Sequence, residues 1–194
     1  MLTEVPTRHL TAAETAKALK RELQTRFPTA TFSVKSETYS GGASISVRWL
    51  DGPAWDDVES LAQQYAGAGF DGSIDLQYSK RHWLLPDGSI RFADTEGSEG
   101  SMGQHGARKT KHPEGAILVR LGADFVSCNR DYSPAFLCRM AQRVAKEFGC
   151  VAPEVAVSTY DGTGYIKDRD TRHVWGTYSA GDLAYQLATK TAEE

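Results

Sequence analysis

FSVKSETYSGGASISVRWLDGP, residues 32–53, contains the clearest structural signal in the chain. Two runs in this stretch alternate apolar with polar side chains: Phe32 and Val34, then Ile45, Val47 and Trp49. Alternation of this kind is typical of strands with one face in a core and the other in solvent. Tyr39-Ser40-Gly41-Gly42 separates the runs and supplies a turn. The stretch therefore predicts an antiparallel hairpin with one buried face.

Helix-forming sequence lies on both sides of this hairpin. Before it, the segment from Thr11 to Arg26 has one apolar face, and Thr11 with Glu14 forms a capping box. After it, Asp51-Gly52-Pro53 ends the strand and starts a second helix. Because an isolated hairpin is only marginally stable in water, we expect both helices to pack on its apolar face. The result is an α-β-β-α unit.

The same order of elements is predicted nearer the C-terminus. AILVRLGADFV, residues 116–126, indicates one buried strand, or two strands broken near Gly122. Next come a helix that starts at Ser133-Pro134, a hairpin in EVAVSTY and GYIKD, and a closing helix from Ser179. A constant offset of 121 residues aligns positions of the two halves, among them Gly41 with Gly162. An internal repeat is one interpretation. The other is that any two helix-hairpin-helix segments share such features.

These elements predict an α+β protein with an antiparallel sheet packed by helices, possibly built from two α-β-β-α units in pseudo-repeat. We expect a single compact unit over residues 1–194, with possible sub-units at 10–67 and 133–191 and a loop-rich middle at 68–132. In that middle, IDLQY and SIRFA suggest short strands on either side of a turn at Pro86-Asp87-Gly88.

Composition limits the compartment and the possible partners. The 194 residues carry a formal net charge of −3, too small for binding to nucleic acid through overall charge. Cys128, Cys138 and Cys150 fit neither a disulfide framework nor a zinc pattern, so we expect buried, reduced thiols. The start of the chain does not resemble a signal peptide, and no apolar run approaches the roughly 18 residues of a membrane span. These features predict a cytoplasmic protein without cofactor or metal.

The segment GSEGSMGQHGARKTKHPEG, residues 97–115, is the most unusual in the chain. It belongs to a predicted long loop with acidic residues at one end and basic residues at the other. Its candidate contact residues are Arg108, Lys109, Lys111 and His112. Lysine and arginine in a glycine-rich loop can grip phosphate or a macromolecular partner, whereas a solvated loop without function has the same composition. No phosphate-loop pattern is present.

A second candidate surface lies earlier in the chain, where aromatic and basic residues alternate. Tyr78, His82, Trp83 and Phe92 stand close in sequence to Lys80, Arg81 and Arg91. Aromatic rings between basic side chains are typical of surfaces that hold single-stranded nucleic acid. Alternatively, Trp83 is a core residue beneath the turn that follows it. We take Lys80, Arg81 and Trp83 as the candidate contact residues of this region.

Several of these segments together resemble a known family. The residues that carry the resemblance are the hairpin at 32–53 with its following helix, then FDG, HWLLPDGSI, and GADFVSCNRDYSP before another helix. They are similar to the large polyvalent protein-associated domains, small α+β units in proteins of phages, plasmids and conjugative elements. The similarity extends from about Thr11 to Phe148. It implies a setting in which such proteins protect incoming DNA or disarm host defences, and it implies no catalytic residue.

Three functions are compatible with these features. The first is a small non-enzymatic accessory protein that binds a host defence protein or nucleoprotein complex and inhibits it, as anti-CRISPR and anti-restriction proteins do. The second is direct binding of single-stranded or transferred DNA. The third is a small enzyme that modifies a nucleotide or a host protein, with His105 or His112 as general base.

Overall fold

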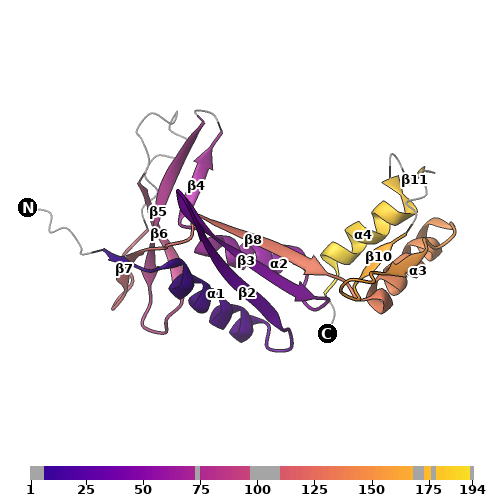
Figure 1. The fold of residues 1–194 in the computed structure, drawn as a ribbon, viewed down its shortest axis with the longest axis horizontal. Coiled ribbons are helices and arrows are strands. Elements are labelled where there is room, and N and C mark those ends of the chain that lie inside the picture. Colours follow the sequence, from indigo (N-terminus) through magenta and orange to yellow (C-terminus); the bar gives the residue numbers. More distant parts are fainter. Residues whose placement is uncertain (1–6, 73–74, 97–109, 168–172, 176–177, 193–194) are drawn as a thin grey trace, which may run out of the picture. The chain divides into compact units, whose positions relative to one another are not determined.

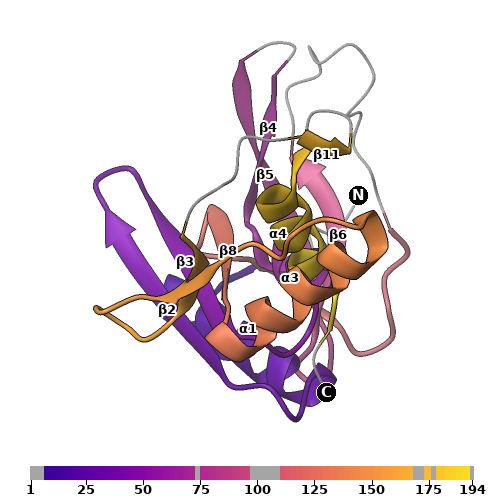
Figure 2. The same ribbon diagram turned by 90° about the vertical axis from the view of Figure 1, so that its right-hand side faces the viewer.

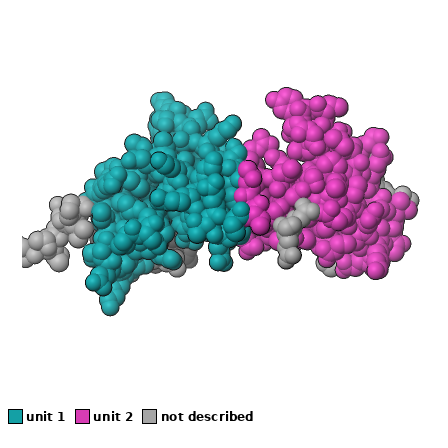
Figure 3. All heavy atoms as spheres, turned by 90° about the horizontal axis from the view of Figure 1, so that it is seen from below, with its two compact units in different colours: residues 1–28, 32–47, 59–128 teal, residues 29–31, 48–58, 129–194 magenta. Residues whose placement is uncertain are grey.

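The computed structural model describes residues 7–72, 75–96, 110–167, 173–175 and 178–192. It contains two compact units, coloured separately in Figure 3. Unit 1 comprises residues 1–28, 32–47 and 59–128, and unit 2 comprises residues 29–31, 48–58 and 129–194. Helices and mixed sheets make the chain an α+β protein, which confirms the predicted fold class.

The predicted N-terminal helix and hairpin are present (Figure 1). Helix α1 (Ala12–Arg26) begins with the capping box that Thr11 forms with Glu14. It packs against β2 (Phe32–Tyr39), which a turn with Gly41 in a left-handed conformation (φ 100°) joins to β3 (Gly42–Leu50). The core positions of these elements are Leu19, Leu23, Phe32, Ile45 and Val47. Helix α2 (Trp55–Ala62) follows β3, and a 3₁₀ turn, η1 (Gln63–Tyr65), continues it.

The sheets are mixed, which corrects the expectation of a purely antiparallel sheet. Strand β3 pairs with β2 on one edge and with β8 (Phe125–Asp131) on the other. Asp124 N–H donates to the Ala43 carbonyl at one end of the β3–β8 pair, and Asp51 N–H donates to the Asp131 carbonyl at the other. From the first of these hydrogen bonds to the second, the residue numbers increase along both strands, so β3 and β8 run parallel. The short β1 (Arg8–His9) also pairs in parallel, with β7 (Ile117–Arg120).

Residues 68–132, where the sequence indicates mainly loops, hold most of a five-stranded sheet. Its central strand is β5 (Leu76–Leu84), which pairs with β4 (Ala68–Asp71), β6 (Ile90–Glu96) and β7. The strands were underestimated because Lys80 and Arg81 interrupt the apolar alternation of β5 that would have marked a long strand. The segment 116–126 divides into β7 and β8, the second of the two predicted alternatives.

Unit 2 contains α3 (Pro134–Phe148) and α4 (Ala180–Lys190), which pack side by side (Figure 2). Ser133 caps α3 and Ser179 caps α4, both as predicted. A hairpin of β9 (Val155–Val157) and β10 (Gly164–Ile166) packs on α3, and β11 (His173–Trp175) pairs with β12 (Tyr178–Ser179). The core of the unit consists of apolar residues from both helices and β10: Leu137, Met140, Ala141, Val144, Ile166, Leu183 and Ala184.

The predicted repeat is visible in element order but not in strand pairing. Gly41 and Gly162, which the offset aligns, both have positive φ, and Ile45 and Ile166 are both buried. Strand β3, however, pairs with β8, whereas β9 and β10 form a sheet of two strands. Among the described residues, the two hairpins therefore belong to separate sheets.

Two expectations from composition can be compared directly with the structure. All three cysteines are free thiols, as predicted. Cys138 is exposed, however, since it lies on the outer face of α3, next to the inward-facing Leu137. Among the described residues, none of the helices combines the length and the apolar character needed to cross a membrane.

A buried arginine joins the ends of several elements of unit 2. The guanidinium group of Arg130, in β8, donates hydrogen bonds to five backbone carbonyls at 2.7–3.2 Å: those of Asp51, Gly52, Ala188, Thr189 and Thr191. It also lies over the rings of Tyr132 and Phe136, at 5.3 and 5.1 Å. Three of these carbonyls are at the C-terminal end of α4, where carbonyls lack helical partners and a positive charge is favourable. Burial lowers the pKa of Arg130.

We expect Arg130→Ala to destabilise the protein by about 3 kcal/mol or more, because several buried carbonyls lose a charged donor at once. Arg130→Lys should recover only part of this loss, since an ammonium group cannot reproduce the planar fork. Urea unfolding measures both changes. The control is Arg48→Ala, which removes an ion pair in which Arg48 Nη2 contacts both carboxylate oxygens of Asp131, from a side chain that is 54% exposed. It should cost much less than Arg130→Ala, because water screens an exposed ion pair. Equal losses for Arg130→Ala and Arg48→Ala would contradict this role of Arg130.

Candidate functional site

One edge of β5 is divided between two partner strands. Residues Leu76–Ser79 pair with β4, and residues Arg81–Leu84 pair with β7. Lys80 lies at the point of division, and its N–H donates to the Gly67 carbonyl at 2.8 Å. The side chains of Lys80 and His82 alternate with those of Arg81 and Trp83, so the two pairs lie on opposite faces of the sheet.

A bulge on the other edge of β5 decides which residues of β6 face Lys80 and His82. Lys80 pairs with Thr95 and Arg81 with Asp94, but His82 pairs with Phe92, so Ala93 is an extra residue in β6. Without the bulge, Thr95 and Phe92 would point to opposite faces, because they are three positions apart. The extra residue brings both onto the face of Lys80 and His82.

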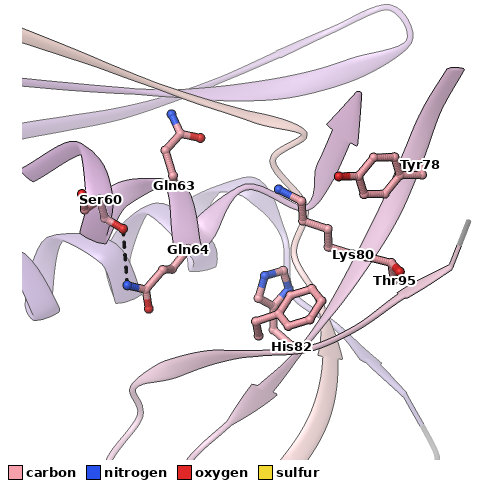
Figure 4. A pocket seen from close by; sticks show the side chains of 8 residues that line it. Ser60, Gln63, Gln64, Tyr78, Lys80, His82 and Thr95 are labelled. Atoms are coloured by element: carbon pink, nitrogen blue, oxygen red, sulfur yellow. Dashed lines mark hydrogen bonds between the residues drawn. The ribbon is translucent and has the colours of Figure 1, made fainter. Parts of the chain in front are cut away.

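A pocket of about 330 Å³ lies on this face, within unit 1 (Figure 4). Strands β5 and β6 contribute Tyr78, Lys80, His82, Phe92 and Thr95, and the end of α2 with η1 contributes Ser60, Gln63 and Gln64. The helical side is fixed by hydrogen bonds: Gln63 Nε2 donates to the Val126 carbonyl at 3.1 Å, and Gln64 Nε2 to the Ser60 carbonyl at 3.3 Å. The Tyr78 ring lies against Gly69, where a Cβ atom would be only 2.3 Å from the ring.

Two buried polar atoms of the pocket have no hydrogen-bond partner among the described residues: Nδ1 of His82 and Oγ1 of Thr95. His82 is 1% exposed and its ring makes an edge-to-face contact with Phe92, with centroids 6.2 Å apart. A buried polar atom without a partner costs about 1–3 kcal/mol, and such atoms are rare in native proteins. Their presence in one pocket makes it the candidate binding site of unit 1.

Burial also changes the charge of the pocket. It lowers the pKa of His82 to about 4, and the positive charge of Lys80 acts in the same direction. Asp94 and a hydrogen bond to the Gln64 backbone carbonyl oppose this shift only in part. His82 is therefore neutral at pH 7. Desolvation likewise lowers the pKa of Lys80. None of the described lining residues is Asp or Glu.

The opposite face of β5 anchors the end of the long loop. Arg81 forms a bidentate ion pair with Asp94, at 2.6 and 2.7 Å. Trp83 is buried, donates from Nε1 to Thr110 Oγ1 at 2.9 Å and stacks on the His112 ring with centroids 4.5 Å apart. The Thr110 hydroxyl is 3.0 Å from both the Phe92 and Ala93 carbonyls. The bulge carbonyls are thus satisfied by the segment that follows residues 97–109.

The structure separates the residues that the sequence marked as candidates. Lys80 lines the pocket, whereas Arg81, Trp83 and His112 belong to the opposite face. Lys111 is exposed, and Arg108, Lys109 and His105 lie outside the described residues. His112 Nε2 is 2.9 Å from the Ala116 carbonyl. Trp83 is a core residue, as the alternative interpretation predicted, although it lies within β5.

Sequence reasoning pointed to half of the residues that line the pocket, with Lys80 among its candidate contact residues. Tyr78, His82 and Phe92 were noted as aromatic residues, but Ser60, Gln63, Gln64 and Thr95 carry no signal of their own. Their contribution depends on the β6 bulge and on the packing of η1 near β6. Within the described ranges, no group of three or more His, Cys, Asp or Glu side chains could hold a metal ion. Burial raises the pKa of the Cys128 thiol, in the middle of β8, to about 12.

Fold and site define an α+β protein with a pocket between β5, β6 and η1, in which two buried polar atoms have no partner among the described residues. A family model described as large polyvalent protein associated domain 29 matches residues 10–133. This is more than half of the chain, and the chain belongs to that family. Domains of this kind occur in polyvalent proteins associated with mobile elements. All residues of the pocket fall inside the match. No curated protein and no solved structure matches the chain.

We expect the stability of the protein to depend on His82 between pH 6.5 and pH 4. Because the folded pKa lies below the ordinary value of 6.5, protons bind more readily to the unfolded chain. Above pH 6.5, neutral His82 therefore makes its full contribution to the free energy of unfolding. This contribution, about 3 kcal/mol in total, is lost as the pH falls toward 4. Urea unfolding at several pH values, compared with His82→Gln, isolates this term. An unchanged profile in His82→Gln would refute the assignment.

Thr95→Val should stabilise the protein by about 1 kcal/mol, because it replaces a buried hydroxyl that has no partner with a methyl group of similar size. The control is Thr15→Val. The Thr15 hydroxyl is also buried, but it donates to the Thr11 carbonyl at 2.9 Å and accepts from Gly122 N–H at 3.4 Å. That substitution should destabilise by about 1–2 kcal/mol. Thermal and urea unfolding measure both, and a destabilising Thr95→Val would show that its hydroxyl is already satisfied.

Proposed function

We propose that this chain is a non-enzymatic accessory protein of a mobile element that acts by binding. Its partner in this proposal is a host defence protein or nucleoprotein complex, which it inhibits in the manner of an anti-CRISPR or anti-restriction protein. Family membership supports the mobile-element setting. The inhibitory role and the identity of the partner are the proposal.

The observation that carries the binding role is the pair of unpartnered polar atoms in the pocket, Nδ1 of His82 and Oγ1 of Thr95. These atoms offer hydrogen bonds to a bound group. General acid-base catalysis is most efficient when the pKa of the catalytic group lies near the working pH, whereas that of His82 is about 4. Two histidines were proposed from the sequence as a general base: His112 stacks on Trp83 away from the pocket, and His105 lies outside the described residues. The pocket therefore favours recognition over turnover.

The test is a pull-down from lysate of a host bacterium with the tagged chain, with and without nuclease, followed by an activity assay of the captured complex. We expect a defence protein or nucleoprotein complex in stoichiometric amount, with reduced activity when the chain is bound. Lys80→Glu should lose both capture and inhibition, because it reverses the charge of the pocket. Lys20→Glu, at an exposed lysine of α1 outside both candidate surfaces, is the matched control. A captured complex that keeps full activity, or no stoichiometric partner at all, would refute the proposal.

A further inference from the structure

The state of the His82 ring specifies one property of the ligand. One ring nitrogen bonds the Gln64 carbonyl, and since Nδ1 has no partner, the proton of the neutral ring belongs on Nε2. Nδ1 then carries a lone pair and can only accept. A ligand that completes this site must therefore present a hydrogen-bond donor to His82.

Lys80 calls for the opposite kind of group on the ligand, a hydrogen-bond acceptor. Its ammonium group shares the pocket with His82 and pairs across the strands with Thr95, and no carboxylate among the described lining residues faces it. It requires an acceptor from the ligand. An anion would satisfy Lys80 but would meet the lone pair of His82, and a cation would be repelled by Lys80. The two requirements together select a neutral group with a donor and an acceptor close to each other.

The side chains that line the pocket limit the shape of a ligand that can fit it. Phe92 and Tyr78 contribute aromatic rings, and the volume of about 330 Å³ is at the small end of the range for ligand sites. Gln64 uses its amide nitrogen on the Ser60 carbonyl, so its amide oxygen can accept from a ligand. Flat neutral groups that combine donors and acceptors on one edge and stack on aromatic rings are the nucleobases, which proteins recognise in unpaired form by these contacts.

We propose that the pocket of Lys80, His82, Phe92 and Thr95 binds one unpaired nucleobase, with a donor on Nδ1 of His82 and an acceptor at Lys80. The base comes from a free nucleoside or from a single strand, as in a nucleoprotein complex. The inference rests on the proposed function in taking the same pocket as the recognition site. It is tested without any host protein.

The experiment titrates the purified full chain with adenosine, guanosine, cytidine and uridine, and separately with short single-stranded DNA. Calorimetry measures affinity, and the nitrogen resonance of His82 Nδ1 reports a new hydrogen bond. Thr95→Val should weaken binding roughly fivefold and Lys80→Met roughly tenfold or more. Lys111→Met should change it less than about twofold. Because Thr95→Val is expected to be more stable than the natural chain, its weaker binding cannot result from unfolding.

Binding of nucleosides with these effects identifies a site for free bases, and binding of single strands alone with the same effects identifies a site for a base within a strand. No binding of either probe overturns the inference. So does strand binding that depends on Lys111 and salt but not on Thr95, because it reports backbone contacts only. A positive result here with a failed pull-down would retain the base site and reject the host partner. A successful pull-down without binding of nucleosides or single strands would reject the base site and indicate that the pocket binds a group of the partner protein.

Discussion

The division of one edge of β5 between β4 and β7 is the constraint on which the architecture of unit 1 depends. A single strand serves three partners, and at Lys80 the pairing changes from one partner to the next. A regular ladder leaves little room for a pocket, because neighbouring side chains pack across it. Here the change of partner and the β6 bulge fall within a few residues, and the pocket opens beside them. Its position therefore follows from strand pairing.

The bulge in β6 has different surroundings on the two faces of the sheet. On one face, hydrogen bonds stabilise it, and on the other it shapes the pocket. On the Trp83 face, Thr110 bonds the Phe92 and Ala93 carbonyls and accepts from the indole. On the His82 face, Nδ1 of His82 and Oγ1 of Thr95 keep no partner among the described residues. A native protein tolerates such a cost where a function requires it. The hydrogen bonds of Thr110 on the Trp83 face therefore stabilise the bulge that shapes the pocket on the His82 face.

Local signals in the sequence predicted local structure well. The caps at Thr11, Ser133 and Ser179 fixed three helix starts, because a capping hydrogen bond depends on residues only a few positions apart. The parallel pairings of β1 with β7 and of β3 with β8 join distant segments, and no short pattern encodes them. The site was harder still: Thr95 enters it only through the bulge at Ala93, and Gln63 and Gln64 only through the position of η1.

The role of Arg130 is another feature that the sequence does not predict. In sequence it stands in a strand followed by a helix start and is an ordinary charged residue, which is usually exposed. In the structure it is buried, and carbonyls from residues 51–52 and 188–191 converge on it. Carbonyls at a helix end and in a turn need donors, and a single guanidinium group supplies five. Buried polar groups therefore stand in opposite situations in the two units. Arg130 has its hydrogen bonds supplied by the chain itself, whereas Nδ1 of His82 and Oγ1 of Thr95 have no partner among the described residues.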